Sequence, residues 1–312
     1  MAADTLLTPE EVAQILKLSR FTVYELIKHG DIPVYRIGRS MRIAEMDLKK
    51  YMQNSKRGDP ALSTPESSHF ARNNCDKTPD LIICGQDAML DVLSSHIEPR
   101  LRNGRVLRRY IGSIGGLTAL YNRTINIATA HLWDGDSGEY NVPYIRSYLP
   151  GCKAVVVNLV YRTEGFYVSP GNPKKIIDWT DLVRQDLRFV NRERGSGARV
   201  LLDEMLRKLD IDCELIHGYD HEEMNHLSVA GCVARGDADV GLGTEKTTQQ
   251  VRNVDFIPLQ KERYDMIIFR QDAAKPEFQL LLAILRSPEF RKEIESLGGY
   301  DISQMGEIMA EI

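Results

Sequence analysis

The fold of this chain is decided by one stretch, Phe189-Val190-Asn191-Arg192-Glu193-Arg194-Gly195-Ser196-Gly197-Ala198-Arg199-Val200-Leu201-Leu202. A short apolar strand leads into a serine with a glycine on each side, and an amphipathic helix follows. At such a turn the first backbone N–H groups of the helix have no intrahelical partner, and the helix dipole favours a negative charge there. Ser196 adds a hydroxyl donor. The stretch therefore predicts an anion site, and the alternative is that Ser196 only caps the helix.

A second loop of the same kind lies far earlier in the chain, at Ser113-Ile114-Gly115-Gly116. It follows a predicted strand at 106–111 and begins a helix. Strands are also predicted at 81–84 and 125–130, so strands and helices alternate, which is typical of a parallel sheet with right-handed crossovers. Ligands bind beyond the carboxyl ends of such strands, where this loop is expected to lie.

The later part of the chain repeats this architecture. Strands are predicted at 188–191 and 238–243, and a helix is predicted over 222–234. The segments expected to cross between the two units are extended ones, at 155–161, 166–168, 256–259 and 264–269. The helices at 276–285 and 288–297 are expected to cover the first unit. Two α/β lobes joined in this way form a cleft that can close on a small ligand.

The composition is that of a globular chain of 312 residues, 43% apolar and 27% charged. Residues 1–58 hold ten Lys and Arg residues against seven Asp and Glu residues, whereas the remainder is acidic. The basic part is the one that we expect to meet nucleic acid. Five scattered cysteines without a metal-binding spacing indicate reduced thiols. With no export signal and no membrane-spanning run in the sequence, we expect a cytoplasmic protein without a membrane partner.

Residues 1–53 predict a small α-rich DNA-binding domain. Thr8-Pro9-Glu10-Glu11 is a capping box that begins one helix, and Ser19 can cap a second. The segment 32–43 alternates and turns at its glycine, as a hairpin or wing does, and a third helix is expected at 45–52. Two short helices, a tight turn and a hairpin together are typical of a winged helix-turn-helix domain.

The side chains expected to contact DNA lie on the second helix and on the wing. Four would face a groove from the helix: Arg20, Thr22, Tyr24 and Lys28. Three would lie near phosphates, where counterion release supplies affinity without reading the sequence: Arg36, Arg39 and Arg42. The alternative is a protein-binding module whose arginines are merely solvated. Because useful affinity for double-stranded DNA takes two half-sites, we expect a homodimer.

The head resembles the excisionase-type, MerR-like winged helix-turn-helix family in the segments 7–13, 19–24 and 32–39. Residues 54–79 are polar, with several Pro and Ser residues, and indicate a tether. Residues 80–312 resemble the type II periplasmic-binding-protein fold, in a subclass that is fused to cytoplasmic helix-turn-helix heads. That subclass is associated with molybdate, tungstate or molybdenum-cofactor metabolism.

The resemblance of the body rests on several stretches: 112–117, 130–134, 138–141, 158–165, 170–173, 188–192, 194–197, 236–243 and 262–265. It implies two lobes, lobe I at about 80–160 and 258–312 and lobe II at about 161–257. The family pattern carries Thr after the Gly-Ser-Gly, where this chain has Ala198. One hydroxyl donor of the family pattern is therefore missing.

The predicted ligand site takes donors from both lobes. Ser113 and Ser196 would supply one hydroxyl each, and glycines beside them would let the backbone approach the anion. The two arginines of the later loop can pair with the anion or form surface salt bridges. The full set is Ser113, Gly115, Gly116, His131, Arg194, Ser196, Gly197, Arg199 and Tyr264. Gln86 is kept as a weak contact, whereas Asp87 is given a structural role because its carboxylate would repel an anion.

The sequence gives little support for catalysis or for a protein-bound metal. Ser113 has no Gly-x-Ser-x-Gly context, so we expect no enzyme. His217 and His221 lie near several acidic residues, but the segment is typical of a loop entering a helix. We therefore expect no coordinating metal site and no cofactor besides the anion.

These features predict a transcriptional regulator whose body senses an oxyanion, tungstate or molybdate, by lobe closure. Closure can change DNA binding only if the ligand binds the open and closed states differently. The alternative is a cytoplasmic carrier or sensor of a molybdopterin-type cofactor or another small phosphate-bearing ligand, with the head as an interaction module.

Overall fold

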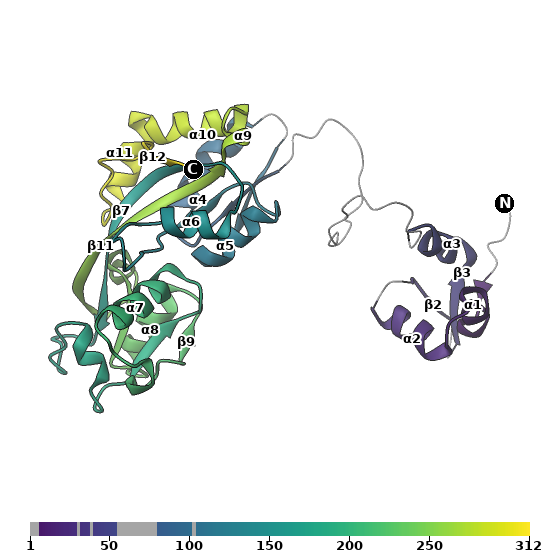
Figure 1. Ribbon diagram of the computed structural model, residues 1–312, viewed down its shortest axis with the longest axis horizontal. Coiled ribbons are helices and arrows are strands. Elements are labelled where there is room, and N and C mark those ends of the chain that lie inside the picture. The colour runs from purple at the N-terminus through teal and green to yellow at the C-terminus, as the bar shows by residue number, and fades with distance from the viewer. Residues whose placement is uncertain (1–5, 30–31, 38–39, 55–79, 102–103) are drawn as a thin grey trace. The chain divides into compact units, whose positions relative to one another are not determined.

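The computed structural model describes residues 6–29, 32–37, 40–54, 80–101 and 104–312 (Figure 1). The chain divides into two compact units, Met1–Arg72 and Asn73–Ile312, which we call the head and the body. The head is a helix-turn-helix domain and the body is a two-lobed α/β domain, so the predicted fold class is confirmed.

The described part of the head packs helices against a small sheet. Its helices are α1 (Pro9–Leu16), α2 (Arg20–His29) and α3 (Glu45–Asn54), and its strands are β1 (Leu6–Leu7), β2 (Tyr35–Ile37) and β3 (Ser40–Ala44). The strands lie in the order β1-β3-β2. The core is formed by apolar side chains of these elements, chiefly Val12, Val23, Ile32, Ile43 and Leu48.

The starts of α1 and α2 follow their sequence signals. The Thr8 hydroxyl accepts a hydrogen bond from the backbone N–H of Glu11 at 3.2 Å, and the Glu11 carboxylate accepts one from the N–H of Thr8 at 2.7 Å. The Ser19 hydroxyl accepts from the N–H of Thr22 at 3.1 Å. The predicted helices and the β2–β3 hairpin are therefore present, while the turn of the wing at 38–39 lies outside the described residues.

Lobe I of the body surrounds a short parallel sheet. It contains β4 (Leu81–Cys84), α4 (Met89–Ile97), the 3-10 turn η1 (Glu98–Arg100), β5 (Val106–Arg109), α5 (Ser113–Tyr121), β6 (Ala128–Ala130) and α6 (Val142–Tyr148). The C-terminal elements α9 (Arg270–Ala273), α10 (Pro276–Arg286), α11 (Pro288–Ser296) and β12 (Ile308–Glu311) complete it. β4 and β5 are parallel, and Ile83 forms a parallel bridge to Ile127, as expected. Phe278 and Phe290 of α10 and α11 join the core of this lobe.

Lobe II holds the glycine-flanked Ser196 loop that precedes α7. It contains η2 (Trp179–Val183), β8 (Phe189–Arg192), α7 (Gly197–Lys208), η3 (Cys213–Leu215), β9 (Glu222–Glu223), α8 (His226–Arg235), β10 (Val240–Thr244) and η4 (Glu245–Gln249). The helix predicted over 222–234 begins later, at His226, because the Asn225 side chain caps it by accepting from the N–H of Ser228 at 2.8 Å. The preceding residues pair with β8 as strand β9.

Two long strands run through both lobes, β7 (Ala154–Val168) and β11 (Asp255–Phe269) (Figure 1). They pair antiparallel along their length, within a sheet of order β6-β11-β7-β10-β8-β9. The sequence predicted broken segments here, because polar residues interrupt the apolar pattern. The lobe boundaries that we predicted fall inside these two strands. Among the described residues no helix is long and apolar enough to cross a membrane.

Candidate functional site

A cavity of about 250 Å³ lies between the two lobes and against the crossing strands. Lobe I contributes Gly112, Ser113, Thr129 and His131 to its wall. Lobe II contributes Arg192, Ser196, Gly197 and His226, and the crossing strands contribute Arg162 and Tyr264. Five of the predicted ligand residues therefore meet at one cavity: Ser113, His131, Ser196, Gly197 and Tyr264.

The Ser113 loop of lobe I and the Ser196 loop of lobe II are in direct contact. The backbone N–H of Ile114 donates to the carbonyl of Gly195 at 3.0 Å, which joins the start of α5 to the loop before α7. Gly112 packs so closely that a Cβ there would lie 3.0 Å from the Cα of Ser196. The N-termini of two helices from different lobes therefore converge on the cavity, as the sequence predicted.

Ser196 caps α7, and it also lies at the cavity where the sequence predicts an anion contact. Its hydroxyl accepts a hydrogen bond from the N–H of Arg199 at 3.3 Å. Gly197 allows the His131 ring to lie against the helix start, because a Cβ at Gly197 would be 2.5 Å from ring atoms of His131. The N–H of His131 in turn donates to the Ser113 hydroxyl at 3.4 Å.

A buried ion-pair network forms one wall of the cavity. The Arg162 guanidinium donates to the Asp87 carboxylate at 2.5 Å, and its other terminal nitrogen lies 2.5 Å from Oε1 of Glu262. The second oxygen of Glu262 is 2.6 Å from Nδ1 of His131. Tyr300 donates its hydroxyl proton to Asp87 at 2.7 Å, which agrees with the structural role expected for that carboxylate. Arg162 is therefore neutralised by carboxylates on both sides.

The shifted pKa values of Glu262, Glu164 and His226 indicate the charge states of this wall. Burial raises the pKa of Glu262, but the charges of Arg162 and His131 outweigh it, so the pKa lies below its ordinary value and the carboxylate stays ionised. Burial, followed by the charge of Glu262, raises the pKa of Glu164 well above its ordinary value and favours the protonated form. Burial and then the nearby guanidinium groups hold the pKa of His226 well below its ordinary value, which favours the neutral ring.

The side-chain ligand atoms of His131, Glu164 and Glu262 lie within 4.8 Å of one another, as they would around a cation. Arg162 and His131 already occupy both oxygens of Glu262, however. A cation here would have to displace the guanidinium or the ring from that carboxylate. We therefore interpret this group as an ion-pair network and not as a metal centre.

Arg192 and Gln86 connect the lobes on the other side of the cavity. The Arg192 guanidinium donates to the Glu193 carboxylate at 2.7 Å and to the Gln86 side-chain oxygen at 3.0 Å. The Gln86 amide donates to the backbone carbonyl of Met224 at 3.2 Å. Gln86, kept as a weak contact from the sequence, thus lines the cavity and spans the two lobes.

Four of the predicted ligand residues do not line the cavity and are corrected here. Arg194 has a 74% exposed side chain and lies 3.6 Å from acidic oxygens of Asp220 and Glu222. Arg199 is buried instead, donates to Asp203 and Glu222 at 3.0 Å each, and stacks on Tyr219. Both arginines already have carboxylate partners outside the cavity.

The other two residues that do not line the cavity are Gly115 and Gly116. They follow Ser113, the last residue of α5 that lines the cavity wall. A Cβ at Gly116 would lie 3.2 Å from the Cys84 sulfur, so this glycine lets the helix pack on β4. A Cβ at Gly115 would make only ordinary contact with Ile111. Packing therefore requires a glycine at position 116, whereas the contacts within the protein do not require one at position 115.

The sequence reasoning missed Arg162, Arg192, Glu164 and Glu262. The signal for two of them was present, since Arg162 and Glu164 are two residues apart in a strand and share a face. A pair of charged residues inside an otherwise apolar strand indicates a buried polar face, and here that face borders the cavity.

The predicted DNA-contacting residues are described only in part. On α2 the Arg20 side chain is 71% exposed and Thr22 and Tyr24 are also exposed. Arg42 of β3 is half-buried and donates to the Met41 carbonyl at 2.9 Å. The side chains of Lys28 and Arg36, and the whole of Arg39, lie outside the described residues.

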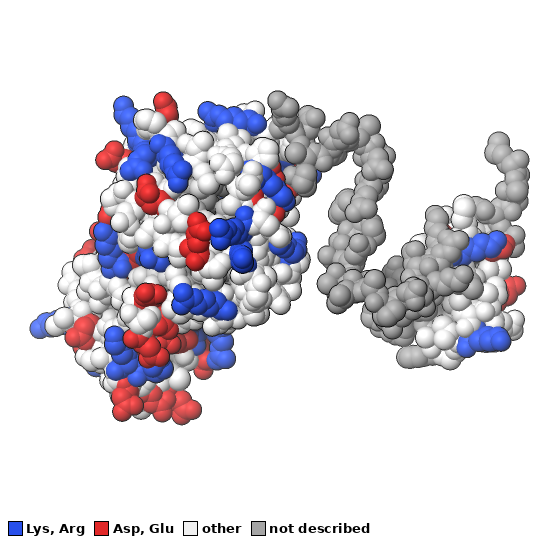
Figure 2. Space-filling model, turned by 45° about the horizontal axis from the view of Figure 1, so that its top comes forward, with Lys and Arg blue, Asp and Glu red and all other residues white. Residues whose placement is uncertain are grey.

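The surface of the body carries mixed charge. On the face drawn in Figure 2, Lys and Arg side chains alternate with Asp and Glu side chains across both lobes. The basic groups of this face therefore do not form a continuous tract of the kind that follows a nucleic-acid backbone.

Comparisons with known proteins agree with this architecture. The PBP superfamily domain matches residues 94–286, and the Helix-turn-helix domain matches residues 6–56. The uncharacterized protein YvgK of Bacillus subtilis (strain 168) is 39% identical over 307 residues, 97% of each chain. The thiosulfate-binding protein of Escherichia coli (strain K12) is 36% identical over 81 residues, 25% of this chain and 22% of that protein.

Among solved structures, a crystal structure of a substrate-binding protein from Clostridium perfringens with bound phosphate has a TM-score of 0.54. It is 13% identical and the match covers 71% of this chain and 98% of that one, which shows a shared fold. The family match covers more than half of the chain and includes both helices whose N-termini meet at the cavity. The chain therefore belongs to the PBP superfamily, with a helix-turn-helix DNA-binding domain at its head.

Proposed function

We propose that this chain is a transcriptional regulator whose body senses a small oxyanion. A helix-turn-helix head joined to a PBP-like ligand-binding body is the organisation of a regulator. The observation that carries the anion proposal is the convergence of the N-termini of α5 and α7 on one cavity, with Ser113 and Ser196 beside them. Helix N-termini supply fixed donors and a favourable dipole for an anion.

The charge state of the cavity supports a ligand held mainly by neutral donors. Arg162 is paired with two carboxylates and Arg192 with Glu193, so neither guanidinium is an uncompensated charge. The protonated form of Glu164 removes one source of repulsion. Serine hydroxyls and helix N–H groups suit a tetrahedral oxyanion, and the family resemblance makes molybdate or tungstate the first candidates.

A second candidate is a small phosphate-bearing ligand. The cavity of about 250 Å³ is also lined by Lys246 and Asn225, which could bind groups beyond a single tetrahedral anion. The substrate-binding protein from Clostridium perfringens, which shares the fold, holds phosphate. Under this alternative the body would carry or sense a phosphate ester, and the head would serve as an interaction module.

Calorimetric titration of the full chain with molybdate, tungstate, sulfate and phosphate tests the proposal. We expect heat of binding with molybdate or tungstate. Ser113→Ala should weaken that binding by about tenfold or more, because a hydrogen bond to a charged ligand is lost. The matched control is Ser137→Ala, an exposed lobe I serine that hydrogen-bonds only within its own turn.

Each outcome of the titration decides between the candidates. Heat with phosphate and none with the metal oxyanions favours the second candidate. No heat with any of the four anions rejects the oxyanion proposal. An equal loss of anion affinity in Ser113→Ala and Ser137→Ala would contradict a contact between the anion and Ser113 in the cavity.

The proposal also includes a homodimer that binds double-stranded DNA in the cytoplasm. Two helix-turn-helix heads are needed to engage two half-sites of an operator. Analytical ultracentrifugation of the full chain measures the mass directly, and a monomer at micromolar concentration with operator DNA present would contradict this part.

A further inference from the structure

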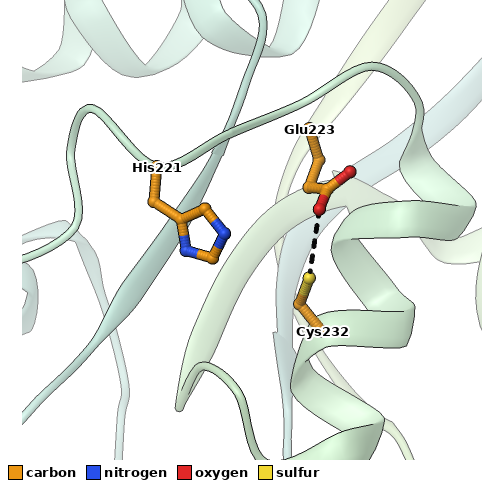
Figure 3. A group of neighbouring side chains, drawn as sticks. All are labelled: His221, Glu223 and Cys232. Carbon is orange, nitrogen blue, oxygen red and sulfur yellow. Dashed lines mark hydrogen bonds between the residues drawn. The ribbon is translucent and has the colours of Figure 1, made fainter.

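A group of metal-ligand side chains lies in lobe II, outside the cavity. His221 precedes β9, Glu223 belongs to β9 and Cys232 lies in α8, and Figure 3 shows the three side chains pointing toward one another. A ring nitrogen of His221, a carboxylate oxygen of Glu223 and the Cys232 sulfur all lie within 4.8 Å of one another. The histidine and the acidic residue are close in sequence, whereas the cysteine reaches them through the fold.

The spacing of these atoms is close to that of a tetrahedral zinc site. The Cys232 thiol donates to Oε1 of Glu223 at 3.4 Å (Figure 3). With zinc–ligand bonds of about 2.0 to 2.3 Å, neighbouring ligand atoms in a tetrahedral site are about 3.3 to 3.8 Å apart. The sulfur and the carboxylate oxygen already have this separation. The imidazole needs to approach by only about 1 Å, which a side-chain rotation can supply.

The backbone of the group is held firmly by the sheet. The N–H of Asn191 donates to the carbonyl of His221 at 2.8 Å, and the N–H of Glu193 donates to the carbonyl of Glu223 at 3.1 Å. Cys232 is 2% exposed within α8, whereas His221 is exposed and Glu223 is half-buried. Two of the three residues therefore lie in regular secondary structure, and the site remains open to an ion on the side of the exposed histidine.

The guanidinium of Arg235 already contacts the Cys232 sulfur, to which a metal ion would bind. Arg235 donates from Nη2 to the Cys232 sulfur at 3.4 Å and from Nε to Asp237 at 2.8 Å. Its side chain is 62% exposed, so it can turn to solvent while it keeps Asp237 as a partner. Burial and the hydrogen bond to Glu223 raise the pKa of Cys232, so the sulfur is a thiol before any metal binds.

We propose that His221, Glu223 and Cys232 form a zinc site in lobe II, with a fourth position open to water. A thiolate, an imidazole and a carboxylate suit zinc, whereas magnesium and calcium prefer oxygen ligands alone. On binding, the zinc–sulfur bond replaces the S–H bond and the proton is released to the buffer. The ion would join the loop before β9 to α8, whose first residue, His226, lines the cavity.

The test uses the full chain, titrated with zinc chloride against a chromophoric chelator and, separately, with cobalt(II). We expect one zinc ion per chain and a thiolate-to-cobalt charge-transfer band. Cys232→Ser and His221→Ala should each weaken zinc binding by at least about 100-fold, since even partners of the ligands are worth up to that factor. Cys232→Ser should also remove the cobalt band.

The matched controls are Cys213→Ser and His217→Ala, a half-buried cysteine and an exposed histidine of the same lobe. Both should leave zinc affinity and the cobalt band unchanged. His221 is exposed, so its variant is expected to fold, and thermal unfolding checks this. Molybdate calorimetry on His221→Ala should match the parent chain, which separates this proposal from the oxyanion proposal.

Three results would overturn the assignment. One is the absence of stoichiometric zinc binding to the parent chain. Another is a cobalt spectrum without a thiolate band. The third is zinc affinity that falls in His131→Gln but not in His221→Ala, because the ion would then lie in the cavity network.

Discussion

Glu164 is a single residue whose protonation should set part of the pH dependence of stability. It is fully buried on β7, and within the described residues neither carboxylate oxygen has a hydrogen-bond partner. Its pKa is raised by burial and by Glu262, so the folded protein keeps a proton that the unfolded chain loses above about pH 4.3. The contribution to stability is present below that pH and is lost as the pH rises toward the folded pKa.

The parent chain should therefore lose stability as the pH rises above about 5, and Glu164→Gln should not show this loss. The loss in the free energy of unfolding is about 1.4 kcal/mol for each unit by which the pKa of Glu164 is raised. Urea unfolding at pH 5 and pH 8 measures it, and the variant should gain most over the parent chain at pH 8. A variant that is less stable than the parent at pH 8 would show that Glu164 is ionised and paired in the folded state.

Glu262 provides the matched comparison on the same face of the neighbouring strand. Its carboxylate holds Arg162 and His131, so Glu262→Gln breaks a buried pair. We expect that variant to lose about 3 to 5 kcal/mol at neutral pH. Replacement by glutamine should thus raise the free energy of unfolding at position 164 and lower it at position 262.

The sequence predicts single residues well where local chemistry fixes them. Ser113 and Ser196 were found because a serine at a glycine-rich helix start has few possible roles. Arg194 and Arg199 were misplaced because folding brings Glu222 to both of them and Asp220 to Arg194. Arg162 was missed although it and Glu164 share one face of a strand, because that pattern does not show that the face borders a cavity.

At the scale of the element, the first turn of α7 depends on Gly197 more than the first turn of α5 depends on Gly115. A Cβ at Gly197 would overlap the His131 ring, whereas a Cβ at Gly115 would make only ordinary contacts. We expect Gly197→Ala to displace His131, to lower stability by about 1 to 3 kcal/mol and to weaken anion binding. Gly115→Ala should be neutral or stabilising by up to about 1 kcal/mol, because alanine favours a helix.

Thermal unfolding and anion calorimetry on both variants check this pair. The two glycines occupy the first turns of the two helices whose N-termini meet, so each serves as the control for the other. If Gly115→Ala lost anion affinity as Gly197→Ala does, the original prediction that Gly115 approaches the ligand would be restored.

The helices were easier to predict than the long strands. Capping signals such as Thr8 and Ser19 act within a few residues, so the sequence displays them directly. β7 was predicted as two pieces because its central residues, Arg162 and Glu164, are charged. Their burial is made possible by partners on β11 and in both lobes, which is information that a local pattern does not contain.

At the scale of the whole molecule, the body must couple ligand binding to the relation between its lobes. The lobes touch through the Ile114–Gly195 backbone hydrogen bond and through Gln86 and Met224. These contacts surround the cavity, so an anion bound there interacts with the residues that hold the lobes together. The division into a basic head and an acidic body was visible in the sequence, but these contacts between the lobes were not.

If the anion regulates the head, the two binding events must be linked reciprocally. If saturation with the anion changes the affinity for DNA by some factor, saturation with DNA must change the affinity for the anion by the same factor. We expect a factor of about 5 to 150, the range of a coupling free energy of about 1 to 3 kcal/mol. Fluorescence anisotropy with a duplex from the region upstream of the coding sequence measures the first factor, and calorimetry measures the second.

Ser113→Ala should lose the coupling at anion concentrations that saturate the parent chain, while its DNA affinity without anion stays unchanged. If neither affinity changes, the head and the body bind their ligands independently. The anion can alter DNA binding only if it binds the DNA-bound and DNA-free states with different affinities.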